Sequence, residues 1–146
     1  MNDLTFIAVK TIEDLNIVRI LRNQCRLYMT RFTDEIGYQQ QLDWYWSLDL
    51  DTNKLFLLKK DNNPIGYGYL RVDSDKVLLT GGLGESERDK GYGKFLFNSL
   101  IEESKKFERP IQLEVLKTNT RAFKLYESLG FSTIKEDEEK IYMEIK

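Results

Sequence analysis

The sequence predicts a mixed α/β fold, in which one mostly antiparallel sheet carries helices on both faces. Three short strand-like runs between residues 54 and 83 follow one another with only turns between them, which indicates antiparallel pairing. A helix-like segment then leads to an apolar run at 111–116, as expected for a crossover to a parallel strand. Because 146 residues suffice for one hydrophobic core, we expect a single domain over residues 1–146.

The first elements follow from alternation and capping. Residues 4–9 alternate in the manner of a strand. Thr11 can cap a helix, and Asp14 three residues later completes an approximate capping box. A polar loop at 30–37 then leads to a second helix at 38–48.

A three-stranded meander is predicted next. The strands lie at 54–60, 65–72 and 77–83, and the turns between them are the polar sequences at 61–64 and 73–76.

The last third alternates helix and strand before it closes as a hairpin. Apolar spacing predicts a helix at 95–107 and a buried parallel strand at 111–116. The next helix has an apolar stripe that includes Tyr126, and Gly130 supplies its C-terminal cap. Residues 131–145 are expected to form the hairpin.

Composition excludes several classes of function. The chain has no histidine, so Ser-His-Asp and Cys-His catalysis and histidine-based zinc sites are impossible, and we expect no metal. A net charge of −2 argues against nonspecific nucleic-acid binding. The chain lacks a long apolar run and a signal-like start, and its single cysteine, Cys25, cannot form an internal disulfide. We therefore expect a cytoplasmic protein that binds neither membranes nor nucleic acid.

The turn at residues 84–94 has the features of an anion site. It connects the strand at 77–83 to a helix, and it contains Gly91 and Gly93 among basic residues. Amides in the first turn of a helix lack intrahelical partners, and glycine lets a phosphate approach them. The spacing fits neither a Walker loop nor a dinucleotide-binding fingerprint. A solvated, flexible turn is the alternative.

This turn reads Arg-x-x-Gly-x-Gly, which resembles the acetyl-coenzyme A signature of the GCN5-related N-acetyltransferase (GNAT) superfamily. A second block, from Leu113 to Phe131, is similar to a later motif of the same superfamily, with strand, Asn, helix with Leu-Tyr, and Gly-Phe. The resemblance implies a V-shaped split between the fourth and fifth strands, into which the pantetheine arm of the coenzyme enters.

The resemblance also implies a set of coenzyme contacts. The amides of residues 88–94 would hold the pyrophosphate, helped by the side chain of Arg88 or Lys90, and the main chain at Leu83 and Glu85 would pair with the pantetheine arm. The predicted coenzyme-binding residues are Leu83, Glu85, Arg88, Asp89, Lys90, Gly91, Tyr92, Gly93, Lys94 and Asn119. Asn119 has the alternative role of a helix N-cap.

Tyr126 is the predicted catalytic residue. By resemblance, its hydroxyl protonates, or hydrogen-bonds to, the departing thiolate of coenzyme A. Packing in the core alone would also explain a tyrosine on this stripe. The general base stays unassigned: Glu114, Glu85, a water relay and an amine that arrives neutral are all open.

The acceptor residues are predicted from the first two helices. Arg22 and Asn23 precede a Trp-rich second helix that contains Trp44. This arrangement is similar to the one in acetyltransferases that act on nucleotide-linked amino sugars. An arginine can pair with a phosphate, and a tryptophan can stack on a ring. The alternative for Trp44 is that it anchors the helix to the sheet.

The function expected from the resemblance is transfer of the acetyl group of acetyl-CoA to a primary amine, by direct attack. The acceptor would be a small amine, for example a nucleotide-linked amino sugar, and the protein a monomer or homodimer. The alternative is a non-catalytic acyl-CoA-binding module that regulates a partner.

Overall fold

The computed structural model describes residues 3–28, 30, 34–88 and 90–145. Its elements follow in this order: β1 (Leu4–Ala8), α1 (Ile12–Gln24), η1 (Arg26–Tyr28), α2 (Tyr38–Trp46), β2 (Asn53–Lys60), β3 (Asn63–Val72), β4 (Val77–Leu83), η2 (Glu85–Glu87), α3 (Tyr92–Lys105), β5 (Ile111–Leu116), α4 (Thr120–Ser128), β6 (Ser132–Glu136) and β7 (Lys140–Ile145). None of the helices in these ranges is long and apolar enough to cross a membrane.

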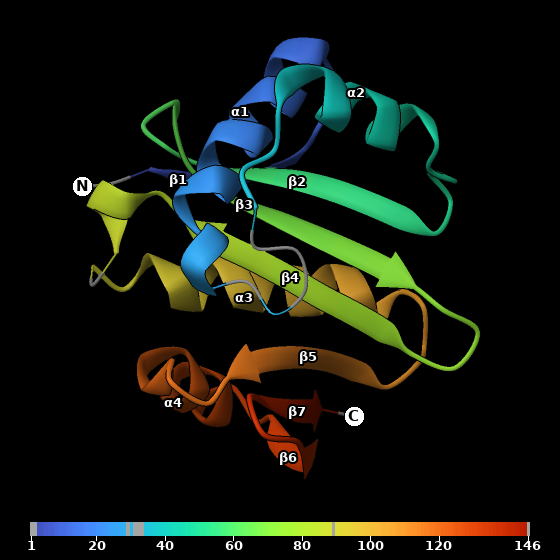
Figure 1. The fold of residues 1–146 in the computed structure, drawn as a ribbon, viewed down its shortest axis with the longest axis vertical. Helices are drawn as coiled ribbons and strands as arrows, with labels where there is room; N and C mark the ends of the chain where they lie inside the picture. Colours follow the sequence, from blue (N-terminus) through green and yellow to red (C-terminus); the bar gives the residue numbers. More distant parts are fainter. Residues whose placement is uncertain (1–2, 29, 31–33, 89, 146) are drawn as a thin grey trace.

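The strands form one sheet in the order β1-β2-β3-β4-β5-β7-β6. Every neighbouring pair is antiparallel except β4 and β5, which are parallel. The parallel pairing covers only Val77 with Ile111 and Leu78 with Gln112, so the two strands diverge beyond these residues. Figure 1 shows β4 and β5 as the two arms of a V, with α4, β6 and β7 on the β5 side. The predicted fold class and the V-shaped split are confirmed.

The helices bury both faces of the sheet. On one face, α1 and α2 cover a cluster that includes Leu15, Leu57 and Tyr67. On the other face, α3 covers a larger cluster, which α4 joins through Tyr126. Alternation along each strand separates the two clusters, because neighbouring side chains point to opposite faces. Along β4, Leu79 therefore faces α3, whereas Gly82 faces α1.

Element boundaries differ modestly from the prediction, with one consequence for the site. The helix predicted from residue 95 begins at Tyr92 in the structure, because Gly91 adopts a left-handed conformation (φ 85°) and acts as its N-cap. Thr11 caps α1 as predicted: the Asp14 amide donates to Thr11 Oγ1, while the Asp14 carboxylate accepts from the amide of Lys10 and not from that of Thr11, so the capping box is only approximate. The short helices η1 and η2 were not predicted.

Candidate active site

A cleft of about 790 Å³ follows the split between β4 and β5. Its walls come from the diverging strands, from the first turns of α3 and α4, and from η1. Of the predicted site residues, the cleft brings together Leu83, Arg88, Gly91, Gly93, Lys94, Asn119 and Tyr126. Glu85, Lys90 and Tyr92 adjoin this group in sequence but do not line the cleft. Asp89 lies outside the described residues.

The N-terminus of α3 opens into this cleft. Because the helix begins at Tyr92, the amides of Gly91, Tyr92, Gly93 and Lys94 are the ones without intrahelical partners. A Cβ atom built at Gly91 would meet no atom within 4 Å, so this position is open. One built at Gly93 would lie 3.2 Å from Leu125 Cδ2, so glycine there also allows α4 to approach α3. The geometry is that of a helix-terminal anion site.

The basic side chains of the turn have protein partners. Arg88 Nη2 donates to the Gln24 carbonyl (2.8 Å), and the guanidinium lies over the Tyr28 ring at 5.0 Å from its centroid. Lys90 Nζ lies 3.7 Å from the Glu87 carboxylate, which Lys60 also contacts. Of the groups predicted to hold the pyrophosphate, the main-chain amides of α3 are therefore better placed than the side chains of Arg88 and Lys90.

The edge of β4 presents main-chain groups to the split. The Val77 amide donates to Pro110 on the β5 side, whereas the Gly84 amide donates to Ile65 on the β3 side. Alternation in an antiparallel pair therefore directs the amides of Gly81 and Leu83 toward β5, beyond the point where β5 pairing ends. The Glu85 amide, in contrast, donates to Gln24 Oε1 (2.7 Å).

Asn119 is the N-cap of α4 and lies in the cleft wall. Its Oδ1 accepts a hydrogen bond from the Ala122 amide (3.3 Å), which fixes the start of α4. Because the residue also lines the cleft, it is near enough to contact a molecule bound there.

Tyr126 is both a core residue and a cleft residue. Its ring makes edge contacts with Phe97 (4.9 Å between centroids) and Phe131 (6.2 Å), and only 9% of the residue is exposed. Burial raises the pKa of its phenol, with a smaller contribution from Cys25. The hydroxyl therefore stays protonated at neutral pH and can only donate to an anion in the cleft.

Cys25 links the C-terminal end of α1 to β4. Its Sγ donates to the Leu83 carbonyl (3.3 Å), and a Cβ built at Gly82 would lie 2.6 Å from this sulfur. Burial raises the pKa of the thiol, although Arg88 opposes the shift. A buried, protonated thiol is unsuited to nucleophilic attack.

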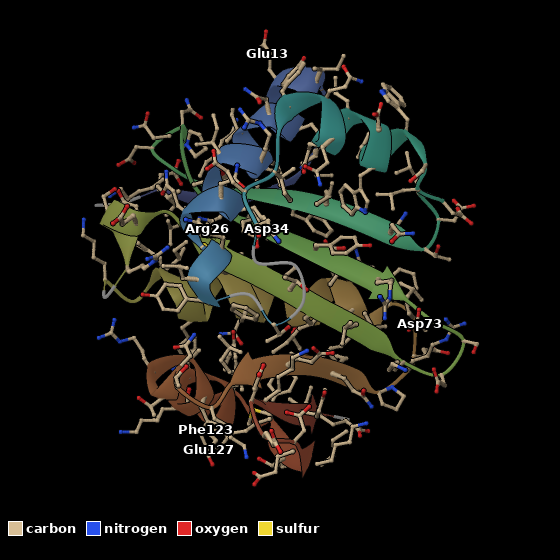
Figure 2. The ribbon with its side chains drawn as sticks, in the orientation of Figure 1. Glu13, Arg26, Asp34, Asp73, Phe123 and Glu127 are labelled. Atoms are coloured by element: carbon tan, nitrogen blue, oxygen red, sulfur yellow. The ribbon has the colours of Figure 1, made fainter. Side chains whose placement is uncertain are left out.

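The residues predicted to bind the acceptor do not line the cleft. Arg22 is 7% exposed and donates to the Asp34 carbonyl (2.9 Å), and burial lowers its pKa. Asn23 exchanges two hydrogen bonds with the backbone of Ile36. Trp44 packs its edge on Tyr69, 5.5 Å between ring centroids. These residues position the loop between α1 and α2 and one residue of the cleft wall. Figure 2 shows Arg26 and Asp34 on the opposite side of the split from Phe123 and Glu127 of α4.

Sequence reasoning missed a group of cleft residues on the α1 face of the sheet. Tyr69 and Arg71 come from β3, and Thr80 comes from β4, where it pairs with Tyr69. Alternation in β3 puts Tyr67, Tyr69 and Arg71 on one face, a signal that the sequence contains. Their position at the split, however, depends on the pairing of β3 with β4.

Glu114 lies on the other wall of the split. Leu78 of β4 pairs with Gln112 of β5 in the last row that the two strands share. Two residues further along each strand, Thr80 and Glu114 therefore face each other across the split. The Glu114 side chain is 7% exposed, and its Oε1 lies 3.8 Å from Lys140 Nζ. The ion pair and the place in the cleft are both present, so the residue remains a candidate base.

Among the residues that the structure describes, no group of three or more His, Cys, Asp or Glu side chains could hold an ion.

The sheet is split between β4 and β5, with the N-terminus of α3 beside the split, and several solved structures share this fold. An N-acetyltransferase from Staphylococcus aureus Mu50 has a TM-score of 0.84 at 16% identity, covering 99% of this chain and 98% of its own. A spermidine N-acetyltransferase from Vibrio cholerae, in complex with CoA and spermine, has a TM-score of 0.84 at 21% identity, covering 97% and 94%. YncA from Salmonella typhimurium, solved with its cofactor acetyl-CoA, has a TM-score of 0.82 at 16% identity, covering 99% and 94%.

A family model gives the more specific result. The model for the acetyltransferase (GNAT) family matches residues 19–131, which include both blocks that carry the resemblance. The chain belongs to this family. A sequence search of curated proteins found no match.

Proposed function

We propose that the protein is an acetyl-CoA-dependent N-acetyltransferase that acts on a small primary amine. The observation that carries this proposal is the single cleft shared by three features: the N-terminus of α3, the unpaired edge of β4, and the hydroxyl-bearing Tyr126. Each suits a different part of one co-substrate, namely a diphosphate, an amide-rich arm and a thioester.

The residues present fit the coenzyme. The open position at Gly91 and the amides of the first turn of α3, which have no intrahelical partners, suit the diphosphate, with Lys94 beside them. The amides of Gly81 and Leu83 suit the pantetheine arm, and Asn119 stands opposite on α4. Engagement of the Glu85 amide would require its bond to Gln24 to break, so Leu83 is the better supported contact.

The chemistry is an acyl transfer without an enzyme-bound intermediate. The coenzyme supplies an acetyl group activated as a thioester. The amine nitrogen of the acceptor forms a bond to the acetyl carbon, the carbon–sulfur bond breaks, and the amine gives up one proton while the thiolate gains one. A main-chain amide on the edge of β4 can stabilise the oxyanion. Glu114 is a candidate acceptor of the amine proton.

Tyr126 is best assigned as a hydrogen-bond donor to the thiolate. An ordinary phenol is already about 1.5 pKa units less acidic than a thiol, so full proton transfer costs about 2 kcal/mol. Burial raises the pKa of Tyr126 further, which increases this cost. A hydrogen bond to the sulfur stabilises the developing charge without it.

Two measurements test the proposal. Acetyl-CoA should raise the melting temperature, and a panel of amines that includes nucleotide-linked amino sugars should release free thiol from it. Binding without thiol release from any amine would favour the alternative, a non-catalytic acyl-CoA-binding module. Absence of both would end the proposal. A cytoplasmic location and a monomeric or homodimeric state remain predictions, and gel filtration tests the second.

A further inference from the structure

One cation in the cleft is not explained by the coenzyme. Among the described residues of the cleft wall, the charged side chains are Arg71, Arg88, Lys94, Glu114 and Arg121. Arg88, Lys94 and Arg121 come from the turn before α3 and from the first turns of α3 and α4, where a diphosphate would lie. Arg71 comes from β3 instead, on the face that α1 and α2 cover.

Distance along the sheet separates Arg71 from the diphosphate site. Arg71 pairs with Leu78, in the last row where β4 and β5 are still joined. The phosphate turn follows Leu83, about 17 Å further along β4 at 3.4 Å per residue. Arg71 is therefore too far along the sheet to bind the diphosphate.

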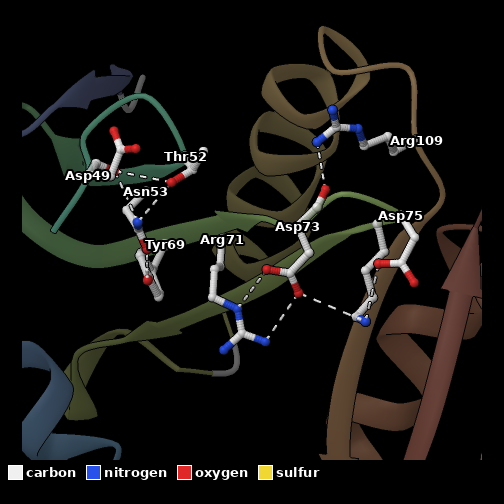
Figure 3. A network of polar contacts seen from close by, with 9 residues as sticks. Asp49, Thr52, Asn53, Tyr69, Arg71, Asp73, Asp75 and Arg109 are labelled. Atoms are coloured by element: carbon white, nitrogen blue, oxygen red, sulfur yellow. Dashed lines mark hydrogen bonds and ion pairs between the residues drawn. The ribbon is translucent and has the colours of Figure 1, made fainter.

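The guanidinium of Arg71 is held in one orientation. Its Nε and Nη2 each lie 3.4 Å from an oxygen of the Asp73 carboxylate. Asp73 is fixed in turn, because Arg109 Nη1 donates to its carbonyl (2.6 Å) and Lys76 Nζ lies 3.9 Å from its carboxylate. Figure 3 shows the other terminal nitrogen of Arg71 on the side away from Asp73.

The ion pairs around Arg71 are confined to one strand end. Lys76 contacts the carboxylates of both Asp73 and Asp75, and Arg109 donates to the Asp73 carbonyl, whereas Asp49 in Figure 3 lies with Asn53 instead.

Beside Arg71, the cleft has a neutral, fixed wall. The Tyr69 hydroxyl donates to Asn53 Oδ1, and burial raises its pKa, so the phenol carries no charge at neutral pH.

We infer that the acceptor amine carries an oxyanion, a carboxylate or a phosphate, which Arg71 binds. The inference rests on the proposed function and specifies its substrate class. A guanidinium with one edge held by Asp73 still offers donors to an oxyanion. Glu114, on the opposite wall, attracts the ammonium end. A polyamine has only positive groups, so Arg71 repels it.

Matched pairs of acceptors test the inference. L-leucine is compared with 3-methylbutylamine, L-phenylalanine with phenethylamine, and glucosamine 6-phosphate with glucosamine; spermidine is the polycation. The first two pairs report a carboxylate and the third a phosphate. In at least one pair, the anionic member should have a kcat/KM at least tenfold higher than its partner, and spermidine should be poorer than that member.

Variants of Arg71 assign the preference to this side chain. Arg71→Gln should raise KM for the anionic member at least tenfold, with little change in kcat or in the stabilisation by acetyl-CoA, and Arg71→Lys should recover part of the loss. Lys76→Gln is the control, because Lys76 contacts the same Asp73 without lining the cleft.

Three results would overturn the inference: equal or better use of the neutral members or of spermidine, an Arg71→Gln variant that affects both members of a pair equally, or no acetylation of any anionic member. If acetyl-CoA itself neither binds nor reacts with any amine, the proposed function fails as well. The two failures are therefore distinguishable.

Discussion

At the scale of single residues, Tyr126 is part of both the hydrophobic core and the cleft wall. Its ring packs in the core against Phe97 and Phe131, and the residue also lines the cleft. The buried ring limits the motion of the hydroxyl, which favours a fixed donor. The raised pKa keeps the proton on the oxygen.

Replacing Tyr126 with phenylalanine should lower kcat about 10- to 100-fold, the range expected for loss of a hydrogen bond to a charged group. The affinity for acetyl-CoA should not change, because the ring and the α3 amides remain. Steady-state kinetics and a binding titration check this. Tyr142→Phe is a matched control, since its hydroxyl bonds to Asp137 outside the cleft. An unchanged kcat in Tyr126→Phe would remove the assignment.

Gly91 allows a second residue-scale prediction. Gly91→Val should reduce stability by about 1–2 kcal/mol, because a β-branched residue is strained at φ 85°. It should also remove most of the stabilisation by acetyl-CoA, about 2.7 kcal/mol at 100 times the dissociation constant.

Gly37→Val is the control for Gly91→Val, since Gly37 is the N-cap of α2, has φ −78° and is equally open. Thermal melts with and without acetyl-CoA measure both effects. Full retention of the ligand-dependent shift in Gly91→Val would contradict the anion site.

At the scale of elements, the C-terminus of α1 and the N-terminus of α3 contribute differently to the turn at residues 84–94. The C-terminal carbonyl of Gln24 in α1 accepts from Arg88, which also compensates the negative end of that helix. The N-terminus of α3 keeps its own amides available. Arg88 thus fixes the turn on α1, and the backbone of α3 is left for the proposed diphosphate contact.

The two roles of Asn119 are separable by substitution. Asn119→Ala should cost about 1 kcal/mol of stability through loss of the cap on α4, and Asn119→Ser should restore most of it. If the amide also contacts the coenzyme, affinity for acetyl-CoA should fall in both variants. Urea denaturation and a binding titration measure the two quantities. Full affinity in Asn119→Ser would show that only the cap matters.

At the scale of the whole molecule, buried phenols set a limit on alkaline stability. Tyr67 and Tyr126 are both buried, and burial raises both pKa values. Below pH 10 both are neutral in the folded and unfolded states. Above about pH 10 the unfolded chain ionises first, so the free energy of unfolding falls by up to about 1.4 kcal/mol per pH unit for each tyrosine.

Denaturation in urea at pH 9, 10 and 11 should reveal this loss. Tyr67→Phe should make the decline above pH 10 shallower, whereas Tyr38→Phe should not, because Tyr38 is 48% exposed. Identical pH dependence in Tyr67→Phe and the original protein would show that burial does not control the alkaline limit.

Much of the fold was predictable because its signals are local. Capping at Thr11, turn residues in the meander and the glycine-spaced turn each act within a few positions of the chain. The helix start at Tyr92 was misplaced by three residues, because the left-handed conformation of Gly91 depends on how the turn sits on α1 and α3.

The predicted coenzyme residues were largely brought to one cleft, since they lie in two short contiguous blocks. The acceptor residues were harder to predict. Arg22 and Asn23 turned inward to hold the backbone at Asp34 and Ile36, although a polar pair on a helix gives no local sign of this.

The sequence by itself determined the order of the strands and α-helices, the glycine-spaced turn before α3 and the family. Only the tertiary structure decided which side chains share the cleft: Arg71 from β3, Thr80 from β4 and Glu114 from β5. The physical reason is that strand register, and the point where β4 and β5 part, arise from pairing between segments distant in sequence. No local pattern specifies that pairing, so the place of Arg71 in the cleft becomes visible only in the folded sheet.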